Sequence, residues 1–541
     1  MKDIRINELK NLSVAALLIA SATFVACSSD DNIIDTPQHP VNPKNTVTLT
    51  TTVSMDGAET RALTSGGVKT FAAGETIAVI YQNTSGATVK AESEALGTDD
   101  ITDEGKSATF TVTLDDPDNT IDVTYIYPAA MANSDGTPNY DALATQDGSL
   151  TTLASNLDYC CKTASWDDSS LPSGVELENQ LTICAFTLKD CFGSSIITSS
   201  LSEVTVSDGT NTYTVAPATG NTFDDDVIYV AMKPVTTNAA LELTATDNTK
   251  YYAKAATSRT YPANSLNNIS MKMYEVIIGK FTVDNSGKQV YFAKGNLQAT
   301  TSNLGSTWTW QFAENQWDKI GDAIANININ GNGTVSTNGT VDLFGWSTGT
   351  TVLGIHNSTN NNDYRNDFVD WGSAAAVTAG IGTGWYTLSG AEWWYLFGLD
   401  EREDHRRPTN SGYHYCKAQV NDVPGVILLP DDWDTNYHAL TFYDELNLSF
   451  DASNIDKITL AEWNSDFAPH GAVFLPTTGQ RNSNTVSNPK GRLYYWSSTG
   501  GTNNNNVPIA YQVYIAGNQV NPNTGASRYL GNAVRLVRNV K

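Results

Sequence analysis

Short runs that alternate apolar and polar residues with a period of two fill the first half of the chain. The first run reads VTLTTTV at residues 47–53, and similar runs occupy residues 77–81, 108–114, 121–127, 181–188, 204–206, 227–232, 240–245 and 269–273. A period of two is the side-chain repeat of a strand with one buried face, and clusters of Gly, Asp, Asn and Pro separate the runs. We therefore expect a mainly β chain with β-sandwiches in its first half.

The charge of the chain is strongly acidic and unevenly distributed. Its 541 residues carry a formal net charge of −26, and residues 27–273 hold most of it, with 32 acidic and 12 basic side chains. Residues 274–541 hold 24 acidic and 17 basic side chains. Excess negative charge repels a phosphate backbone, which excludes an electrostatic nucleic-acid binder. The length predicts about three or four folded units.

The first 26 residues have the composition of an export signal peptide. Three basic residues precede an apolar stretch at 12–25, too short to span a bilayer, which ends just before Cys27. The sequence FVAC at 24–27 resembles a bacterial lipobox, although Phe24 stands where Leu is commoner. The resemblance implies cleavage before Cys27 and a lipid on its sulfur, which would anchor the chain in a membrane. The alternative is an ordinary secretory signal followed by an incidental cysteine.

Residues 27–45 are expected to form a flexible tether, because they lack periodicity and contain three prolines. The tether begins CSSDD, and acidic residues directly after a lipobox resemble the surface-export signal of Bacteroidetes lipoproteins. That resemblance implies a lipoprotein on the outward face of the outer membrane. The alternative is a hydrophilic linker without a sorting role.

Five cysteines remain beyond the lipobox, an odd number for an exported chain. They are Cys160, Cys161, Cys184, Cys191 and Cys416. At least one must be unpaired within a monomer, and no C-x-x-C motif suggests zinc. We expect buried free thiols in strands, with no metal and no cofactor.

An ordered set of short motifs between residues 46 and 273 resembles the fimbrillin family of Bacteroidetes. The motifs are TLT at 48–50, ETRA at 59–62, FAAGETIAV at 71–79, QDGSL at 146–150, LENQL at 177–181 and VSDG at 206–209. The resemblance implies two consecutive transthyretin-like β-sandwiches, which we place at residues 46–155 and 156–273. It also implies an exported lipoprotein that builds or decorates fimbriae together with other fimbrial subunits.

The same resemblance implies a mode of assembly. In fimbrillins that assemble, an arginine-specific protease cuts in the first strand region, and a strand from a neighbouring subunit pairs with the groove that opens. Arg61 and Ala62 stand where such a cut would fall. The alternative is an exposed loop arginine without a role in processing. No free terminal strand is recognisable after residue 273, so the subunit would accept a strand without donating one, as expected at a tip.

The composition changes at Tyr274, after which eleven of the twelve tryptophans occur. The blocks that follow include DLFGW at 342–346, WYTLS at 385–389, GVILLP at 425–430, GAVFLP at 471–476, YWSS at 495–498 and AVRLV at 533–537. YWSS predicts a strand with one large buried ring, and Ser389 with Glu392 predicts a capped short helix. The ordered blocks resemble the C-type-lectin-like fold in the form shared with formylglycine-generating enzymes, which implies an α+β domain at residues 274–541.

The motifs expected of an enzyme are missing from the sequence. Formylglycine-generating enzymes need a pair of active-site cysteines, and residues 274–541 hold Cys416 alone. The sequence has no H-E-x-x-H and no G-x-S-x-G, and Asp431, Asp432 and Asp434 are typical of a solvated acidic turn. We therefore expect a protein that is not an enzyme.

Sugar binding is the other use of a lectin-like fold. Asn521 and Asn523, in the sequence NPN, only approach the calcium-binding loop pattern of lectins, so a calcium-dependent site is not expected. Trp433 and Tyr437, in the loop DDWDTNY, are the aromatic side chains we expect to be exposed to a ligand, although burial would suit them equally.

The predicted function is a fimbrial tip or accessory adhesin that contacts carbohydrate or a surface protein of a host or another bacterium. One alternative is a non-polymerising outer-membrane lipoprotein that captures glycans. A hydrolase is a further alternative that has only the versatility of the fold in its favour.

Overall fold

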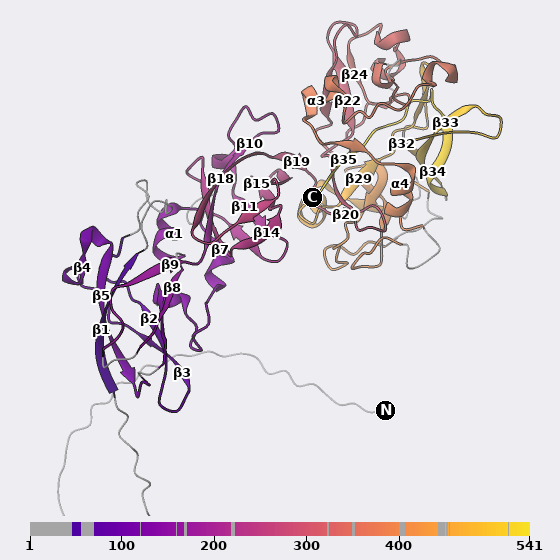
Figure 1. Ribbon diagram of the computed structural model, residues 1–541. Helices are drawn as coiled ribbons and strands as arrows, with labels where there is room; N and C mark the ends of the chain where they lie inside the picture. The colour runs from indigo at the N-terminus through magenta and orange to yellow at the C-terminus, as the bar shows by residue number, and fades with distance from the viewer. Residues whose placement is uncertain are drawn as a thin grey trace, which may run out of the picture. The chain divides into compact units, whose positions relative to one another are not determined.

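The computed structural model describes residues 46–55, 70–118, 121–157, 159–166, 170–217, 222–321, 324–348, 352–399, 406–441, 449–450, 453, 455–517 and 519–540. These residues form a mainly β protein of several sheets with few helices (Figure 1). The expectation of a mainly β chain is confirmed. Cys27, Arg61 and Ala62 lie outside the described residues.

The first sheet has eight strands, and β1 lies inside it between β9 and β5 (Figure 1). Its strands are, in spatial order, β3 (Thr88–Glu92), β2 (Ala78–Gln82), β6 (Val123–Tyr127), β8 (Cys160–Ala164), β9 (Val175–Asn179), β1 (Thr46–Met55), β5 (Ser107–Asp115) and β4 (Ile101–Thr102). Strands from both halves of the sheet share one core, which includes Val53, Phe110 and Tyr125. Side chains of β5 alternate between buried and more exposed, as the period of two predicts.

The next strands surround a second core that includes Phe186, Val206 and Leu243. A six-stranded sheet has the order β19 (Tyr274–Val276), β16 (Tyr251–Ala255), β15 (Glu242–Thr246), β11 (Glu203–Ser207), β12 (Thr212–Val215) and β7 (Thr145–Gln146). The smaller sheets are β13 (Ile228–Met232), β10 (Thr182–Lys189) and β18 (Ser265–Lys272), and the pair β14 (Val235–Ala239) and β17 (Arg259–Tyr261).

Each of the nine runs predicted to be strands overlaps an observed strand, from β1 to β18. The runs were recognisable because their apolar side chains pack in the two cores just described; β2 contributes to both, with Ile80 in one and Val79 in the other. The transthyretin-like type of the two sandwiches is not tested by these pairings and stays a prediction.

The strand pairings do not divide at the predicted boundary between residues 155 and 156. β7 and helix α1 (Leu150–Asn156) precede that boundary, yet β7 pairs with β12 and α1 packs near β13. β8 and β9 follow it, yet they pair with β6 and β1 of the first sheet. The chain therefore crosses between the two groups of strands more than once. The predicted boundary at 274 also falls within a sheet, because β19 pairs with β16.

After β19 the chain forms several smaller sheets around cores rich in aromatic side chains. The first and last strands of this part meet in one sheet, β20 (Phe281–Thr282), β21 (Gln289–Phe292), β35 (Leu536–Asn539) and β25 (Tyr386–Thr387). The other sheets are β23 (Thr309–Phe312), β22 (Leu297–Thr301) and β24 (Gly339–Val341); β28 (Asp456–Ile458), β26 (Tyr415–Val420), β27 (Val423–Leu428) and β29 (Val473–Pro476); β30 (Gln480–Asn482) and β31 (Thr485–Ser487); and β32 (Arg492–Thr502), β33 (Pro508–Ala516) and β34 (Gln519–Ser527).

The described helices of this part are short: α2 (Ile324–Ile327), α3 (Ala375–Ile381), α4 (Gly390–Leu396) and α5 (Leu460–Glu462). The cap predicted at Ser389 is confirmed, since its hydroxyl accepts the amide of Glu392 at 3.2 Å and Glu392 accepts the amide of Ser389 at 2.7 Å. The ring predicted in YWSS is confirmed too, because Trp496 in β32 is fully buried. Within the described ranges, we find no helix with the length and apolarity needed to cross a membrane.

Replacing Ser389 by alanine is expected to lower the free energy of unfolding by about 1 kcal/mol, because the first turn of α4 loses its side-chain acceptor. The measurement is urea unfolding followed by tryptophan fluorescence. Ser389→Asp keeps an acceptor at the same position and should retain most of the stability. Equal losses in both variants would contradict the capping role.

Candidate functional site

Main-chain pairing holds β1 in the first sheet. The strand runs antiparallel to β5 over nine residue pairs, from Thr46 opposite Asp115 to Ser54 opposite Ser107. It also runs parallel to β9 over three pairs that begin at Val53. Such a ladder depends little on side-chain identity, so another extended segment could form the same bonds.

The side chains of β1 are small and mostly polar, since five of its ten residues are threonine. Val53 is fully buried and Thr51 is 1% exposed, and the Thr51 hydroxyl donates to a backbone carbonyl at 2.7 Å. On the opposite face, the hydroxyls of Thr48 and Thr113 lie 3.1 Å apart. The strand therefore fills a place in the sheet while contributing few large apolar side chains.

The neighbouring strand β5 presents its apolar face to the core beside β1. Phe110, Val112 and Leu114 are all buried there. Without β1, the sheet would have two strand edges with unpaired main-chain groups above an apolar floor. A gap of this kind is a template for a strand from another chain.

The predicted cut site follows β1 in the sequence. β1 ends at Met55, and Arg61 and Ala62 belong to residues 56–69, which lie outside the described residues. The structure therefore establishes the seat of β1, and processing at Arg61 stays a prediction. The lipid anchor at Cys27 also stays a prediction.

Of the two placements left open for Trp433, the structure shows burial, because its side chain is fully buried. The indole stacks on Phe467 with ring centroids 5.4 Å apart and meets Tyr437 edge-on at the same distance. The polar residues around Trp433 suggested an open loop. Phe467 is distant in the sequence, and its ring covers the indole face that the loop would otherwise expose.

Tyr437 is partly accessible, with 38% of its surface exposed. One face of the phenol ring is covered by His470, whose ring centroid lies 3.5 Å away and nearly parallel. Tyr437 remains a candidate contact residue, but the ring of Trp433 is not exposed beside it.

Asn521 and Asn523 are exposed, as a ligand contact would require, but they lie on strand β34 and not in a loop. Asn523 faces the first turn of α4, since a Cβ placed on Gly390 would lie 2.2 Å from its Oδ1. Where the structure describes the chain, no three His, Cys, Asp or Glu side chains are grouped so that they could hold a metal ion.

The carboxylate of Asp431 is held by neighbouring side chains and main chain, whereas the acidic sequence around it suggested a solvated turn. Its carboxylate accepts the amide of Thr282 at 2.8 Å and the side chain of Gln289 at 3.0 Å. The guanidinium of buried Arg407 lies 3.3 Å away. These bonds fix Asp431 between strands.

No disulfide joins these five cysteines, all of which the structure describes. Cys160, Cys184 and Cys416 are buried, as expected, whereas Cys161 and Cys191 are only half-buried. Burial raises the pKa of Cys184 to about 12, which keeps this thiol protonated and unreactive.

No family model and no curated protein matches the chain. A solved structure from Bacteroides uniformis, described provisionally as a cell adhesion protein, aligns with 42% of this chain and 96% of its own at 16% identity and a TM-score of 0.26. A fimbrial assembly protein from Parabacteroides distasonis aligns with 43% of this chain and 94% of its own, at 10% identity and a TM-score of 0.25. A fimbrial protein from Bacteroides ovatus aligns with 92% of this chain and 100% of its own, at 10% identity and a TM-score of 0.21.

Proposed function

We propose that the chain is a surface adhesion protein that joins a fimbria as a tip or accessory subunit by exchanging β1 for a strand of a neighbouring subunit. The observation that carries the proposal is the interior position of β1, which combines a long main-chain ladder with small side chains. Two of the similar solved structures are described as fimbrial, and the proposal extends that description to this chain. It rests on β1 and not on those similarities.

The pairing of β35 supports the proposed place at a tip. This strand lies between β21 and β25, with Val537 opposite both Phe292 and Tyr386. Val537 is fully buried, so releasing β35 would open a core. β35 is therefore committed to its own sheet and is not available as a donor strand.

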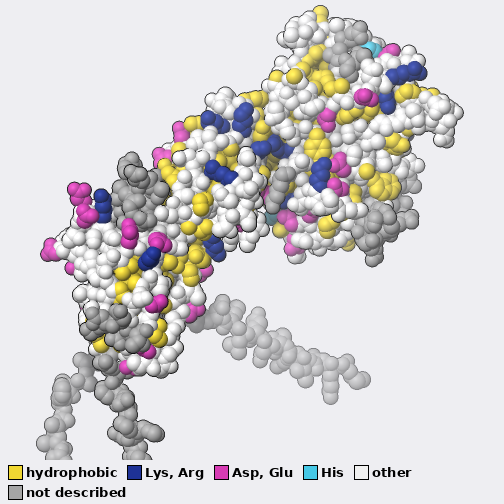
Figure 2. All heavy atoms as spheres, viewed as in Figure 1, with side chains coloured by type: hydrophobic (Ala, Val, Ile, Leu, Met, Phe, Trp, Pro, Cys, Tyr) yellow, Lys and Arg dark blue, Asp and Glu magenta, His cyan; other side chains and the backbone are white. Residues whose placement is uncertain are grey.

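The contact role is assigned to residues 274–541. The acidic side chains Asp99, Asp100, Asp103 and Glu104 gather beside β4 in the first sheet, whereas uncharged side chains cover much of the face that Figure 2 shows after β19. A surface without a dominant charge can approach a partner of either sign without strong electrostatic repulsion. Anchoring at Cys27 would hold the precursor at the outer membrane until Arg61 is cut.

The test begins with the amino terminus of the mature protein from native cells. We expect it to start at Ala62, and a start at Cys27 would overturn the processing step. The full chain, cut after Arg61 in vitro, is then mixed with a fluorescent peptide of residues 46–55. We expect the cut chain to bind the peptide stably and the uncut chain to bind none, because β1 leaves its seat only after the cut.

A disulfide between the paired residues Thr48 and Thr113 provides the matched control. The variant Thr48→Cys/Thr113→Cys should hold β1 in place after the cut and block peptide uptake until a reductant is added. Peptide binding that is equal in cut, uncut and locked chains would contradict strand exchange.

A further inference from the structure

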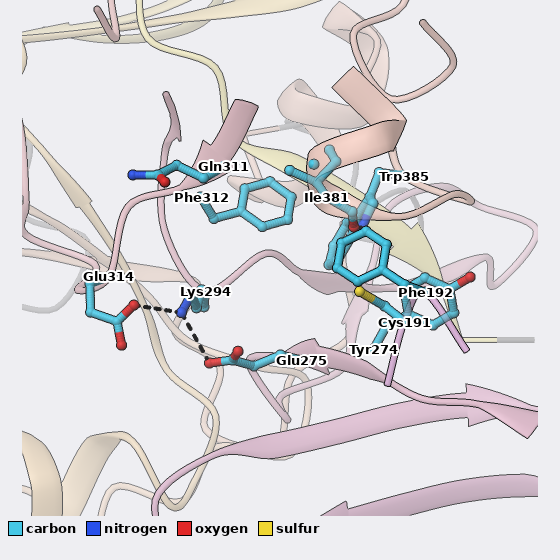
Figure 3. Close-up of a pocket in the computed structure, with 11 residues that line it drawn as sticks. Cys191, Phe192, Tyr274, Glu275, Lys294, Gln311, Phe312, Glu314, Ile381 and Trp385 are labelled. Atoms are coloured by element: carbon cyan, nitrogen blue, oxygen red, sulfur yellow. Dashed lines mark hydrogen bonds and ion pairs between the residues drawn. The ribbon is translucent and has the colours of Figure 1, made fainter. Parts of the chain in front are cut away.

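A pocket of about 340 Å³ opens where β19 meets the sheets that follow it. Its wall combines residues from the turn after β10 with residues from β19, β23 and α3, and Figure 3 shows them as sticks. The volume lies at the lower end of the range found for small-molecule sites, which suits one or two sugar rings.

One side of the pocket is aromatic (Figure 3). Phe312 is half-buried and meets the nearly buried Trp385 edge-on, with ring centroids 4.9 Å apart. Phe192 belongs to the turn after β10, and 49% of its surface is exposed. An exposed ring of this size beside two others provides faces on which an apolar surface can stack.

The opposite side of the pocket is polar. Lys294 lies between two carboxylates, 2.8 Å from Glu314 and 3.4 Å from Glu275 (Figure 3). Burial alone would lower the pKa of Lys294, but its bond to Glu314 and the charge of Glu275 raise that pKa above its usual value. The amine therefore stays charged, and the carboxylate oxygens that it leaves free can accept hydroxyl protons.

A second cavity, of about 170 Å³, shares Glu275, Lys294 and Glu314 with the first. Trp317 lines this second cavity and is half-buried. The three charged residues thus separate two hollows, each of which carries aromatic side chains. A chain of sugar units could pass over the charged residues from one hollow to the other.

The walls of the pocket are held in place by contacts behind them. The guanidinium of Arg538 stacks on Tyr274 at 3.5 Å and lies 5.2 Å from the ring centroid of Trp385. Tyr291 donates to Glu242 at 2.6 Å, which ties β21 to the sheet that contains β19. A site whose walls are fixed before binding loses less entropy when a ligand enters.

We propose that this pocket binds a neutral carbohydrate. Sugar rings have apolar C–H faces, which suit Phe192 and Phe312, and hydroxyls at their edges, which suit Glu275, Glu314 and the exposed amide of Gln311. The charged residues that line the pocket are two glutamates and one lysine, and Lys250 lies 3.9 Å from Glu275, so the acidic and basic groups balance and the site suits a neutral sugar. The inference goes beyond strand exchange and does not depend on it, because the pocket uses no residue of β1, β5 or β9.

The test is isothermal titration calorimetry of the full chain with neutral oligosaccharides of glucose, mannose, xylose and N-acetylglucosamine, and with polygalacturonate as the acidic probe. We expect binding to at least one neutral probe and none to polygalacturonate. Phe192→Ala should weaken binding about tenfold by removing a stacking face. Tyr413→Ala removes an aromatic side chain with 38% exposure that does not line the pocket, and it should leave binding unchanged.

Three results would overturn the proposal: no binding to any neutral probe at millimolar concentration, equal affinities of the Phe192→Ala and Tyr413→Ala variants, or a preference for polygalacturonate. Because Phe192 is an exposed turn residue, its replacement should leave the unfolding curve unchanged. The chain locked by Thr48→Cys/Thr113→Cys should bind the sugar normally, so failure of strand exchange and failure of this site are told apart.

Discussion

Replacing Trp496 by alanine is expected to lower the free energy of unfolding of the part after β19 by about 3 to 5 kcal/mol. The ring is fully buried in the aromatic core that also contains Phe344 and Trp346. Its indole N–H donates to the carbonyl of Phe344 at 2.6 Å. In the reverse direction, the indole N–H of Trp346 donates to the carbonyl of Ser497, the residue after Trp496, at 2.9 Å. The alanine variant would leave a cavity and lose the indole bond, while the Phe344 carbonyl keeps the amide of Asn532 at 2.9 Å.

Urea unfolding followed by tryptophan fluorescence measures this loss, because eleven of the twelve tryptophans lie after residue 274. Trp394→Ala is the matched control, since Trp394 lies in the same part of the chain with 38% of its surface exposed. Its replacement should change stability by no more than about 0.5 kcal/mol. Similar losses in the two variants would show that the reciprocal bonds of Trp496 and Trp346 do not stabilise this core.

The strands that bury one face were predictable from sequence, because the period of two follows directly from strand geometry. Strands such as β9, with the sequence VELEN, were missed because glutamates occupy their exposed positions and leave only a few apolar residues. β9 forms because β8 and β1 lie on either side of it and supply its main-chain partners. Pairing between distant segments leaves little trace in local sequence, so the pairings that cross residues 155 and 156 could not be predicted from it.

One part of the candidate functional residues could also be predicted from local sequence, and another part could not. The position and character of β1 could be predicted, since its alternation is local. The pocket beside β19 could not, because Phe192, Glu275 and Phe312 are far apart in the chain and each is unremarkable in its own segment. Trp433 illustrates the converse, for its local sequence indicated exposure and a distant ring buried it.

Buried charge was also outside the reach of sequence patterns. In the block AVRLV, Arg535 is 1% exposed and donates to the carbonyl of Ala293 at 3.1 Å. Burial lowers the pKa of this guanidinium to about 10, which still leaves it charged at neutral pH. The guanidinium can be buried because a backbone carbonyl of another segment accepts its N–H. The sequence of the block does not indicate this partner.

The stability of the part after β19 is expected to depend on pH through Asp342, which is fully buried. Burial raises the pKa of its carboxyl group from 3.8 to about 6. The amide of Ile320 and the side chain of Asn326 donate to the carboxylate at 2.7 Å each, and these bonds lower the pKa by less than burial raises it. A folded-state pKa above the unfolded value means that protonation favours the fold. The stabilising contribution is therefore fully present below about pH 4 and is lost as the pH rises through about 6.

Comparison with Asp342→Asn isolates this contribution, because the amide does not titrate. The free energy of unfolding of the variant minus that of the original chain should rise by about 2 kcal/mol between pH 4 and pH 7. Asp284→Asn should stay nearly flat over this range and change only below about pH 4, because hydrogen bonds from Ser286 and the amide of Lys288 outweigh burial and lower the pKa of Asp284. Unfolding in urea at a series of pH values measures both differences, and a difference for Asp342→Asn that stays flat from pH 4 to pH 7 would show that the buried carboxyl does not titrate in this range.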